Sequence, residues 1–278
     1  MFLALNPTLA TGRAEWPELA EIASRAGFAG VDVDVRKAMA AGVTATKDLL
    51  LRLQLRPAVV SFPVEFRRDE AAFQAGLADL AATGRFAAAI GCPRTATWLL
   101  PSSELPKAEQ RILYQRRLSE CARVLADAGV RLGLEFVSPL HLRKRYPFEF
   151  IYRMDEMLEF ARECGANVGL LLDSWHWHHA GATIADIRRA GRGGIVHVHL
   201  NDAAAKAPEE VRDNDRLMPG EGVIPLTDFL QALQRIGYGD AVSIEVFGRG
   251  LQDMTVEEAA RLGAETGKAA FRRAGIPV

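Results

Sequence analysis

Short apolar runs alternate along the chain with longer amphipathic segments. The apolar runs have the length and the β-rich composition of strands, and they occupy residues 2–6, 31–35, 57–61, 95–99, 132–136, 168–172, 195–199 and 242–246. Between them, helical periodicity predicts helices over residues 15–27, 70–84, 107–129, 148–165 and 227–237. Several of these segments end at glycines, such as Gly129 and Gly165, which a left-handed helix cap favours.

The number and order of these elements predict the fold class. Eight strands with intervening helices in 278 residues match an α/β protein with a (β/α)8 TIM barrel. No Ser/Pro-rich linker or shift in composition divides the chain, so one domain over residues 1–278 is expected. A doubly wound open sheet is the alternative, and it is disfavoured because no GxGxxG motif follows the first strand.

Strand residues in a barrel point alternately toward the helices and toward the axis, and functional groups lie at the C-terminal ends of the strands. In "RLGLEF" the large apolar residues face outward, which leaves Glu135 as the last inward residue. The same alternation selects Asp173 in "VGLLLD", His199 in "IVHVHL" and Glu245 in "VSIEV". Four successive strands therefore each place one ionisable side chain at the same rim.

Three carboxylates and one imidazole at one rim predict a metal site. Isolated charges in a barrel interior are costly, and a divalent cation removes that cost. The oxygen-rich set suits Mn²⁺ or Mg²⁺, and it also accommodates Co²⁺ or Zn²⁺. On an octahedral ion, four protein ligands leave two positions for a carbonyl and a neighbouring hydroxyl of a substrate. A set of unconnected ion pairs at the barrel mouth is the alternative interpretation.

Composition and charge narrow the choice of partner and location. Lys and Arg total 34 against 35 for Asp and Glu, so a net charge of −1 provides no general attraction to nucleic acid or to a membrane surface. A small-molecule ligand is expected instead. Cys92, Cys121 and Cys164 lack CxxC spacing and are predicted to be buried thiols in a reducing compartment. The opening "MFLALNP" lacks a basic leader and is too short for a signal peptide or membrane span, so a cytoplasmic location is predicted.

The strand-end motifs carry a family resemblance that covers nearly the whole chain. In order they are "LGLEFV", "VGLLLDSWHWH", "VHVHLND", "RLMPGEGVIPL" and "AVSIEVF". Their order and spacing resemble those of the xylose-isomerase-like TIM-barrel superfamily of sugar isomerases and epimerases, and within it inosose (2-keto-myo-inositol) isomerase-like proteins. The resemblance implies a metal held by Glu135, Asp173, His199 and Glu245. It also implies that Glu135 and Glu245 act as the catalytic acid and base, and that His176 and Arg216 contact substrate oxygens.

The activity implied by the resemblance is proton transfer next to a carbonyl, through a metal-bound enediolate, on a sugar, ketose or inosose. Isomerisation and epimerisation both remain open. One alternative is a 3-dehydroshikimate-dehydratase-like lyase, although that branch tends to carry glutamine where this chain has His199. A non-catalytic sugar-binding barrel is another, and a related metal-dependent endonuclease is disfavoured by the net charge. Relatives of this kind form homodimers and homotetramers.

Residues around the predicted ligands receive supporting roles. Trp175 or Trp177 is predicted to form a wall of the pocket, while His178 and His179 are predicted to lie outside the site. His197, one inward layer deeper than His199, is predicted to be a hydrogen-bonded histidine of the barrel interior.

For three further features the sequence leaves the role open or indicates a structural one. Asp202 is either an acceptor supporting the site or a loop-starting residue. Glu65 follows the third strand and can reach the mouth. The basic run at residues 143–146 is predicted to be a solvated loop, with a capacity to hold an anionic group beside the site.

Overall fold

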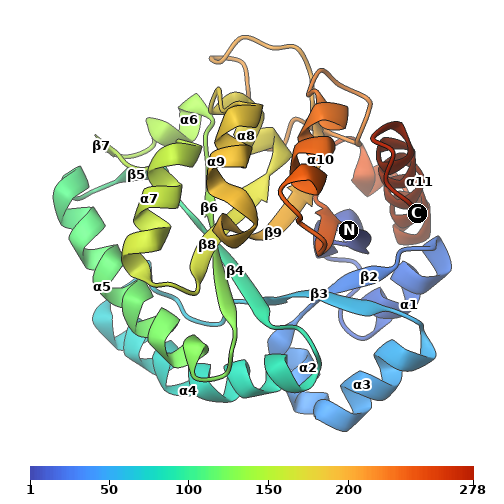
Figure 1. Ribbon diagram of the computed structural model, residues 1–278, viewed down its shortest axis with the longest axis horizontal. Helices are drawn as coiled ribbons and strands as arrows, with labels where there is room; N and C mark the ends of the chain where they lie inside the picture. Colours follow the sequence, from blue (N-terminus) through green and yellow to red (C-terminus); the bar gives the residue numbers. More distant parts are fainter.

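The computed structural model describes all 278 residues and has a closed barrel of eight parallel strands at its centre (Figure 1). The barrel strands are β1 (Phe2–Leu5), β2 (Gly30–Val33), β3 (Arg56–Ser61), β4 (Arg94–Leu99), β6 (Arg131–Phe136), β8 (Val168–Asp173), β9 (Ile195–Leu200) and β12 (Ala241–Ile244). They pair in the order β1-β12-β9-β8-β6-β4-β3-β2, and β2 pairs with β1 to close the ring. The predicted (β/α)8 barrel is confirmed.

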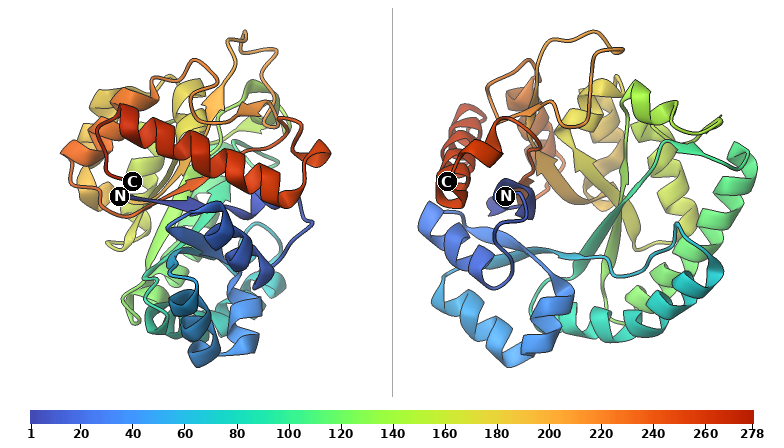
Figure 2. Two further views of the ribbon diagram at one scale, coloured as in Figure 1. Left: turned by 90° about the vertical axis from the view of Figure 1, so that its right-hand side faces the viewer. Right: turned by 180° about the vertical axis from the view of Figure 1, so that it is seen from behind.

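Helices surround the barrel, and short elements line its mouth. The helices are α1 (Glu18–Ala26), α2 (Val35–Ala41), α3 (Val43–Arg52), α4 (Glu70–Ala89), α5 (Lys107–Ala126), α6 (Leu140–Arg143), α7 (Met154–Cys164), α8 (Ser174–His179), α9 (Ile184–Gly194), α10 (Leu226–Arg235) and α11 (Val256–Arg273). Two 3-10 turns are η1 (Pro7–Ala10) and η2 (Leu251–Asp253). Two antiparallel pairs complete the structure: β5 (Ser102–Ser103) with β7 (Phe148–Glu149), and β10 (Asp202–Ala203) with β11 (Arg216–Leu217). Helix α11 contacts α1 and β1, so the two chain ends lie close together (Figure 2).

Each of the eight predicted strands exists, with shifted ends. The largest differences are at the second and last strands, which end at Val33 and Ile244, each two residues before the predicted end. The Asp34 side chain accepts hydrogen bonds from the backbone amides of Arg36 and Lys37, which starts helix α2 at Val35. Glu245 lies just beyond the end of β12.

Two predicted helices need correction. Residues 148–149 form strand β7 against β5, and the helix predicted from residue 148 begins only at Met154. Helix α4 does not stop at Gly84 but continues to Ala89, and Gly84 serves close packing, since a Cβ there would lie 3.1 Å from the Ala128 Cβ. The sequence prediction also omitted α2, α3, α6, α8, α9 and α11.

The two glycines predicted to close helices differ from one another. Gly129 has a φ of +68° in the left-handed region and follows the end of α5 after two intervening residues. Gly165 directly follows α7 but has an extended backbone, so the left-handed cap predicted there is wrong. Its role is close packing, since a Cβ would lie 3.1 Å from the Ala122 Cβ and 3.2 Å from the Asn167 Oδ1.

Strand side chains alternate between pointing toward the helices and pointing into the barrel. The core therefore has two parts, one between the strands and the helices and one inside the barrel. Outward residues such as Leu134, Leu172 and Val198 are fully buried against the helices. Several inward residues are small and lie close together, and a Cβ on Gly133 would lie 3.3 Å from the Ala96 Cβ. Inward side chains fill the lower part of the barrel, and the polar inward residues lie at its C-terminal mouth.

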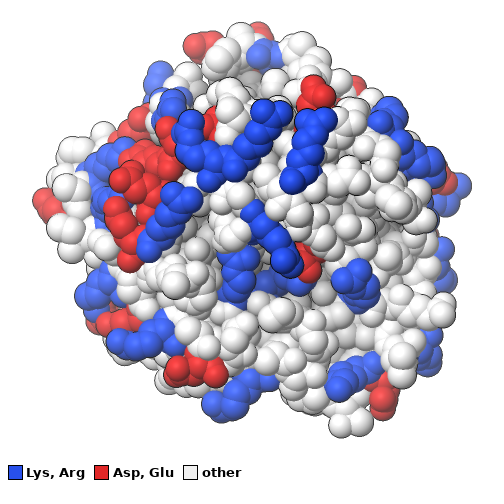
Figure 3. Space-filling view, in the orientation of Figure 1, with Lys and Arg blue, Asp and Glu red and all other residues white.

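Charge is mixed over the surface. On the face shown in Figure 3, basic and acidic side chains are interleaved, in keeping with the net charge of −1. All three cysteines are buried, as predicted, and burial raises their thiol pKa values to about 12. None of the helices has the length and apolar character needed to span a bilayer.

Candidate metal centre

The structure brings the four predicted ligands together at the C-terminal mouth of the barrel. Their ligand atoms lie within 4.8 Å of one another, and the set is Glu135, Asp173, His199 and Glu245. Strand register explains the meeting: Asp173 of β8 is directly opposite His199 of β9, and Ser243, two residues before Glu245, is opposite His199 on the other side. The alternation read from the sequence is therefore the alternation of the folded strands.

The imidazole of His199 is at the centre of the cluster. Its Nδ1 atom lies 3.1 Å from Glu245 Oε2, 3.5 Å from Glu135 Oε1 and 3.9 Å from Asp173 Oδ2. His199 and Glu135 are buried, and Glu245 is nearly so. All three carboxylates therefore lie within 3.9 Å of one ring nitrogen, as ligands of a shared cation do.

Asp173 is oriented by its own helix and by Asn201. Its Oδ1 atom accepts hydrogen bonds from the backbone amides of Trp175 (2.7 Å) and His176 (2.9 Å), which caps the N-terminus of α8. Its Oδ2 atom accepts a hydrogen bond of 2.8 Å from the Asn201 side-chain amide, which also donates to the Glu245 carbonyl. One carboxylate oxygen thus holds the helix, and the other faces the cluster.

Arg216 supplies positive charge beside the three carboxylates. Its Nη1 atom donates to Asp173 Oδ2 at 2.9 Å and to Glu245 Oε2 at 2.6 Å, and its Nη2 donates to Asp213 Oδ1 at 3.0 Å. Nη2 also lies 3.1 Å from His176 Nε2. Burial and the positive charge of Arg216 lower the pKa of His176, so its imidazole is neutral near pH 7. The two residues predicted to contact substrate therefore meet at the edge of the cluster.

The two glutamates have opposite electrostatic environments. Burial raises the pKa of Glu135 to about 7, with help from the charge of Glu245, although the neighbouring imidazole of His199 opposes the rise. Burial also disfavours the charged form of Glu245, but His199 and Arg216 overcome it and hold its pKa at about 2. For His199, burial is likewise outweighed by the two glutamates, which raise its pKa well above the usual value.

The donor set fits a divalent cation. Glu135 Oε1 and His199 Nδ1 are buried without a hydrogen-bond partner, and both face the centre of the cluster. Buried polar atoms without partners are uncommon, and metal coordination satisfies them. Three carboxylates with one imidazole form an oxygen-rich set of the kind that divalent cations prefer.

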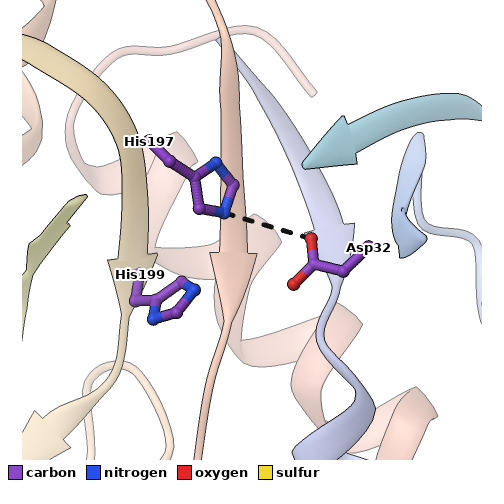
Figure 4. A group of neighbouring side chains, drawn as sticks. All are labelled: Asp32, His197 and His199. Carbon is purple, nitrogen blue, oxygen red and sulfur yellow. Dashed lines mark ion pairs between the residues drawn. The ribbon is translucent and has the colours of Figure 1, made fainter. Parts of the chain in front are cut away.

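Sequence reasoning missed Asp32, a buried carboxylate on β2 beside the cluster (Figure 4). It accepts hydrogen bonds from Asn6 Nδ2 at 2.8 Å and from Ser243 Oγ at 2.6 Å, and burial raises its pKa to about 6. Ser243 Oγ also lies 3.1 Å from His197 Nε2, while His197 Nε2 and Asp32 Oδ1 are 4.0 Å apart. Asp32, His197 and His199 also approach one another closely enough to hold a metal. Because Asn6 and Ser243 already occupy both Asp32 oxygens, we interpret this second group as hydrogen-bonded support for the first.

The inward alternation of "VDVDV" was the signal that could have identified Asp32. It places Asp32 in the same phase as the other site residues, but in the first half of the barrel. His197 occupies the predicted place, fully buried inside the barrel, and burial lowers its pKa well below the usual value.

Two cavities open onto the cluster. One of about 330 Å³ is lined by Asp32, Glu135, His199 and Glu245, and one of about 390 Å³ is lined by Glu135, His176, Arg216 and Glu245, among others. Trp98 of β4 lines both.

The prediction that Trp175 or Trp177 forms a wall of the pocket is wrong. Trp175 is buried, with its ring centroid 4.3 Å from that of His179. Trp177 packs against Phe229, and its indole N–H donates to the Thr183 carbonyl. The short helix α8 directs both rings into the protein. The exposed aromatic side chain that lines both cavities is Trp98, which lies opposite Glu135 in the register of β4 and β6.

Hydrogen bonds to the Asp202 side chain hold the loop that carries Arg216. Its buried carboxylate accepts hydrogen bonds from the backbone amides of Gly220, Gly222 and Ile224, and from that of Ala203. Of the two roles left open by the sequence, the structure shows an acceptor that folds residues 216–224 against strand β10.

The remaining residues flagged in the sequence lie farther out. His178 and His179 are half-buried on α8 and do not line either cavity. Glu65 is exposed and pairs with Arg67 at 3.2 Å. In the basic run at residues 143–146, Arg143 pairs with Glu149 at 2.7 Å.

A family model described as xylose isomerase-like TIM barrel matches residues 20–270. The chain belongs to this family. Inosose isomerase of Halalkalibacterium halodurans is 27% identical over 215 residues, which cover 76% of this chain and 74% of that protein. Inosose isomerase of Bacillus subtilis is 32% identical over 150 residues, or 54% of this chain and 51% of that protein, so this match spans about half of each.

Solved structures of the family superpose closely. A xylose isomerase domain protein from Alicyclobacillus acidocaldarius has a TM-score of 0.90 and 31% identity, and the match covers 99% of both chains. The IolI protein, in a crystal structure described as containing a zinc atom, has a TM-score of 0.79 and 24% identity, with 97% of this chain and 98% of that one covered; at this identity the likeness shows the fold. The named relatives are isomerases and epimerases, which confirms the expectation of an enzyme at the level of the family.

Proposed function

We propose that this chain is a divalent-metal-dependent isomerase or epimerase of a sugar, ketose or inosose. The observation that carries the proposal is the pair Glu135 and Glu245, two carboxylates that line the same cavities and converge on one candidate cation position with Asp173 and His199. The inosose isomerase and D-psicose 3-epimerase names of relatives support the same class of reaction.

Glu135, Asp173, His199 and Glu245 would hold the cation, and the excess of carboxylates favours Mn²⁺ or Mg²⁺, while Zn²⁺ or Co²⁺ also fits. When bound, the cation would polarise a substrate carbonyl and the neighbouring hydroxyl, and so acidify the C–H between them.

The glutamates then transfer the proton, and other residues of the chain bind the substrate. One of the two glutamates removes the proton from the carbon next to the carbonyl, and a glutamate or a water molecule returns it. Return to the neighbouring carbon gives isomerisation, and return to the opposite face of the same carbon gives epimerisation. Arg216 and the neutral His176 line the same cavity and contact substrate oxygens. Asp213, bonded to Arg216 at 3.0 Å, holds the guanidinium in place.

Proton NMR in D₂O tests the proposal directly. The protein, reconstituted with Mn²⁺, is incubated with inososes, ketoses, hydroxypyruvate and 3-dehydroshikimate, and again after chelator treatment. We expect metal-dependent deuterium uptake next to the carbonyl together with a new isomer of one substrate. Loss of water from 3-dehydroshikimate would show the lyase reaction in its place.

Two variants separate catalysis from general damage. Glu245→Gln keeps the shape of the side chain and should slow exchange by about 10²- to 10⁴-fold, the usual contribution of a positioned acid or base. Glu209→Gln, on an exposed loop, is the matched control and should exchange at the wild-type rate. If the protein binds Mn²⁺ but exchanges no proton in any candidate, the proposed chemistry is wrong.

A further inference from the structure

A third cavity adjoins the proposed reaction site. It has a volume of about 440 Å³ and shares Trp98, Leu100 and Arg145 with the cavity of about 390 Å³ that contains Glu135 and Glu245. Its outer wall includes both residues of strand β5, which pairs with β7 near helix α6 (Figure 1). A ligand that reacts between the glutamates therefore has room to extend past Trp98 toward β5.

Two arginines line this outer cavity. Arg145 is exposed and lines both cavities, and its guanidinium has neither a hydrogen-bond partner nor a carboxylate within 4.0 Å. Arg67 is largely buried, with only 20% of its side chain exposed, and its Nε has no hydrogen-bond partner. The one carboxylate in the lining, Glu104, is exposed and forms no ion pair. The lining thus carries an excess of positive charge, although the chain as a whole is close to neutral.

The position of Arg67 is fixed by its neighbours. Its Nη2 donates to Thr97 Oγ1 at 2.7 Å and to the Trp98 carbonyl, and its guanidinium carbon lies 4.1 Å from the centroid of the Trp98 ring. Glu65 neutralises Arg67 only from the exposed side, at 3.2 Å. A guanidinium held in this way needs little further ordering to bind an acidic group, and arginine is well suited to carboxylates and phosphates.

From these contacts we propose that the substrate carries an anionic group, a carboxylate or a phosphate, at the end remote from its reacting hydroxy-ketone. Arg145 binds that group, with Arg67 beside it. The inference rests on the proposed function for the location of the reacting end. Because Arg145 has no carboxylate partner of its own, a neutral substrate would gain little from this guanidinium, whereas an anionic group would form charge-assisted hydrogen bonds with it.

Binding of non-reacting polyols tests the charge preference without turnover. D-Glucitol, D-gluconate and D-glucitol 6-phosphate differ at one end, and their affinities for the Mn²⁺-loaded protein can be measured by calorimetry. We expect at least one acid to bind about 10- to 100-fold more tightly than glucitol. The comparison of gluconate with glucitol 6-phosphate shows which anion the site takes.

Arg145→Gln should abolish this advantage, and Lys144→Gln is the matched control. Lys144 is the adjacent exposed cation and lines neither cavity, so its loss should leave the advantage within about twofold. Acids that bind no better than glucitol would overturn the inference. An advantage that survives Arg145→Gln would also overturn it, because the acids would then be bound elsewhere, for example at the metal.

Turnover distinguishes this inference from the proposed function. In the deuterium-exchange assay, D-fructose, D-fructose 6-phosphate and D-fructuronate are compared. Arg145→Gln should raise KM for the preferred acidic ketose by about 10-fold or more and leave kcat and the neutral ketose nearly unchanged. If no ketose exchanges but the acids still bind through Arg145, the proposed function fails and the anion site stands. If charged and neutral ketoses exchange equally well, the proposed function stands and the anion site is wrong.

Discussion

Replacing Asp202 with alanine should destabilise the loop that carries Arg216. The Asp202 carboxylate is buried and accepts four backbone N–H groups, at 2.9 Å from Ala203, Gly220 and Ile224 and at 3.0 Å from Gly222. Gly220 and Gly222 are exposed, so water can replace the carboxylate there. The Ile224 amide is buried, so it would lose its partner without replacement.

The magnitude follows from these bonds. A hydrogen bond to a charged group contributes about 1.5–3 kcal/mol, and an unsatisfied buried amide costs about 1–3 kcal/mol. Allowing for re-solvation of the exposed amides, we expect Asp202→Ala to lower the free energy of unfolding by about 3 kcal/mol. For 278 residues the unfolding entropy is about 0.6 kcal/mol/K, so the Tm should fall by about 5 °C.

Circular dichroism during thermal and urea unfolding measures the effect. Glu209→Ala, in the exposed part of the same connection between β10 and β11, is the control and should change the free energy by less than about 0.5 kcal/mol. The Asp202 variant should also lose activity, because β11, which holds Arg216, pairs with Asp202 and Ala203 of β10. A Tm within about 1 °C of the wild type would show that these hydrogen bonds do not hold the loop, and the reasoning would be refuted.

Three further predictions concern the same mouth of the barrel. Gly222→Ala should destabilise the fold by about 1–3 kcal/mol in urea unfolding, since its Cβ would overlap the Ala203 carbonyl oxygen and lie 2.6 Å from Asp202 Oδ1; an unchanged midpoint would contradict this. Asn201→Ala removes the amide that orients Asp173 and should weaken Mn²⁺ binding by about 10- to 100-fold in a calorimetric titration, whereas equal affinity would separate Asn201 from the metal site. Chelation should lower the Tm by about 5 °C relative to protein with Mn²⁺ at 100 times its Kd, because ligand binding then adds about 2.7 kcal/mol of stability; a Tm that does not respond to Mn²⁺ would argue against a bound cation.

The sequence was most informative where one periodicity decided the outcome. Strand alternation with a period of two predicts that Glu135, Asp173, His199 and Glu245 point into the barrel, and in the structure their ligand atoms lie within 4.8 Å of one another. The sequence was less informative where pairing with a distant segment overrode the local periodicity. Residues 148–149 have an apolar and helical context, yet they form a strand because β5, 45 positions earlier, supplies its partner.

The sequence by itself determined the barrel and the inward phase of its strands, because strand periodicity and the order of elements are local properties that repeat eight times. Only the tertiary structure decided what surrounds the four ligands. Arg216, Asp213 and Asp202 come from connections whose conformation depends on hydrogen bonds between distant segments. The burial of Trp175 was decided in the same way, since the packing of neighbouring elements, and not the spacing along the chain, sets where the short helix α8 directs its side chains.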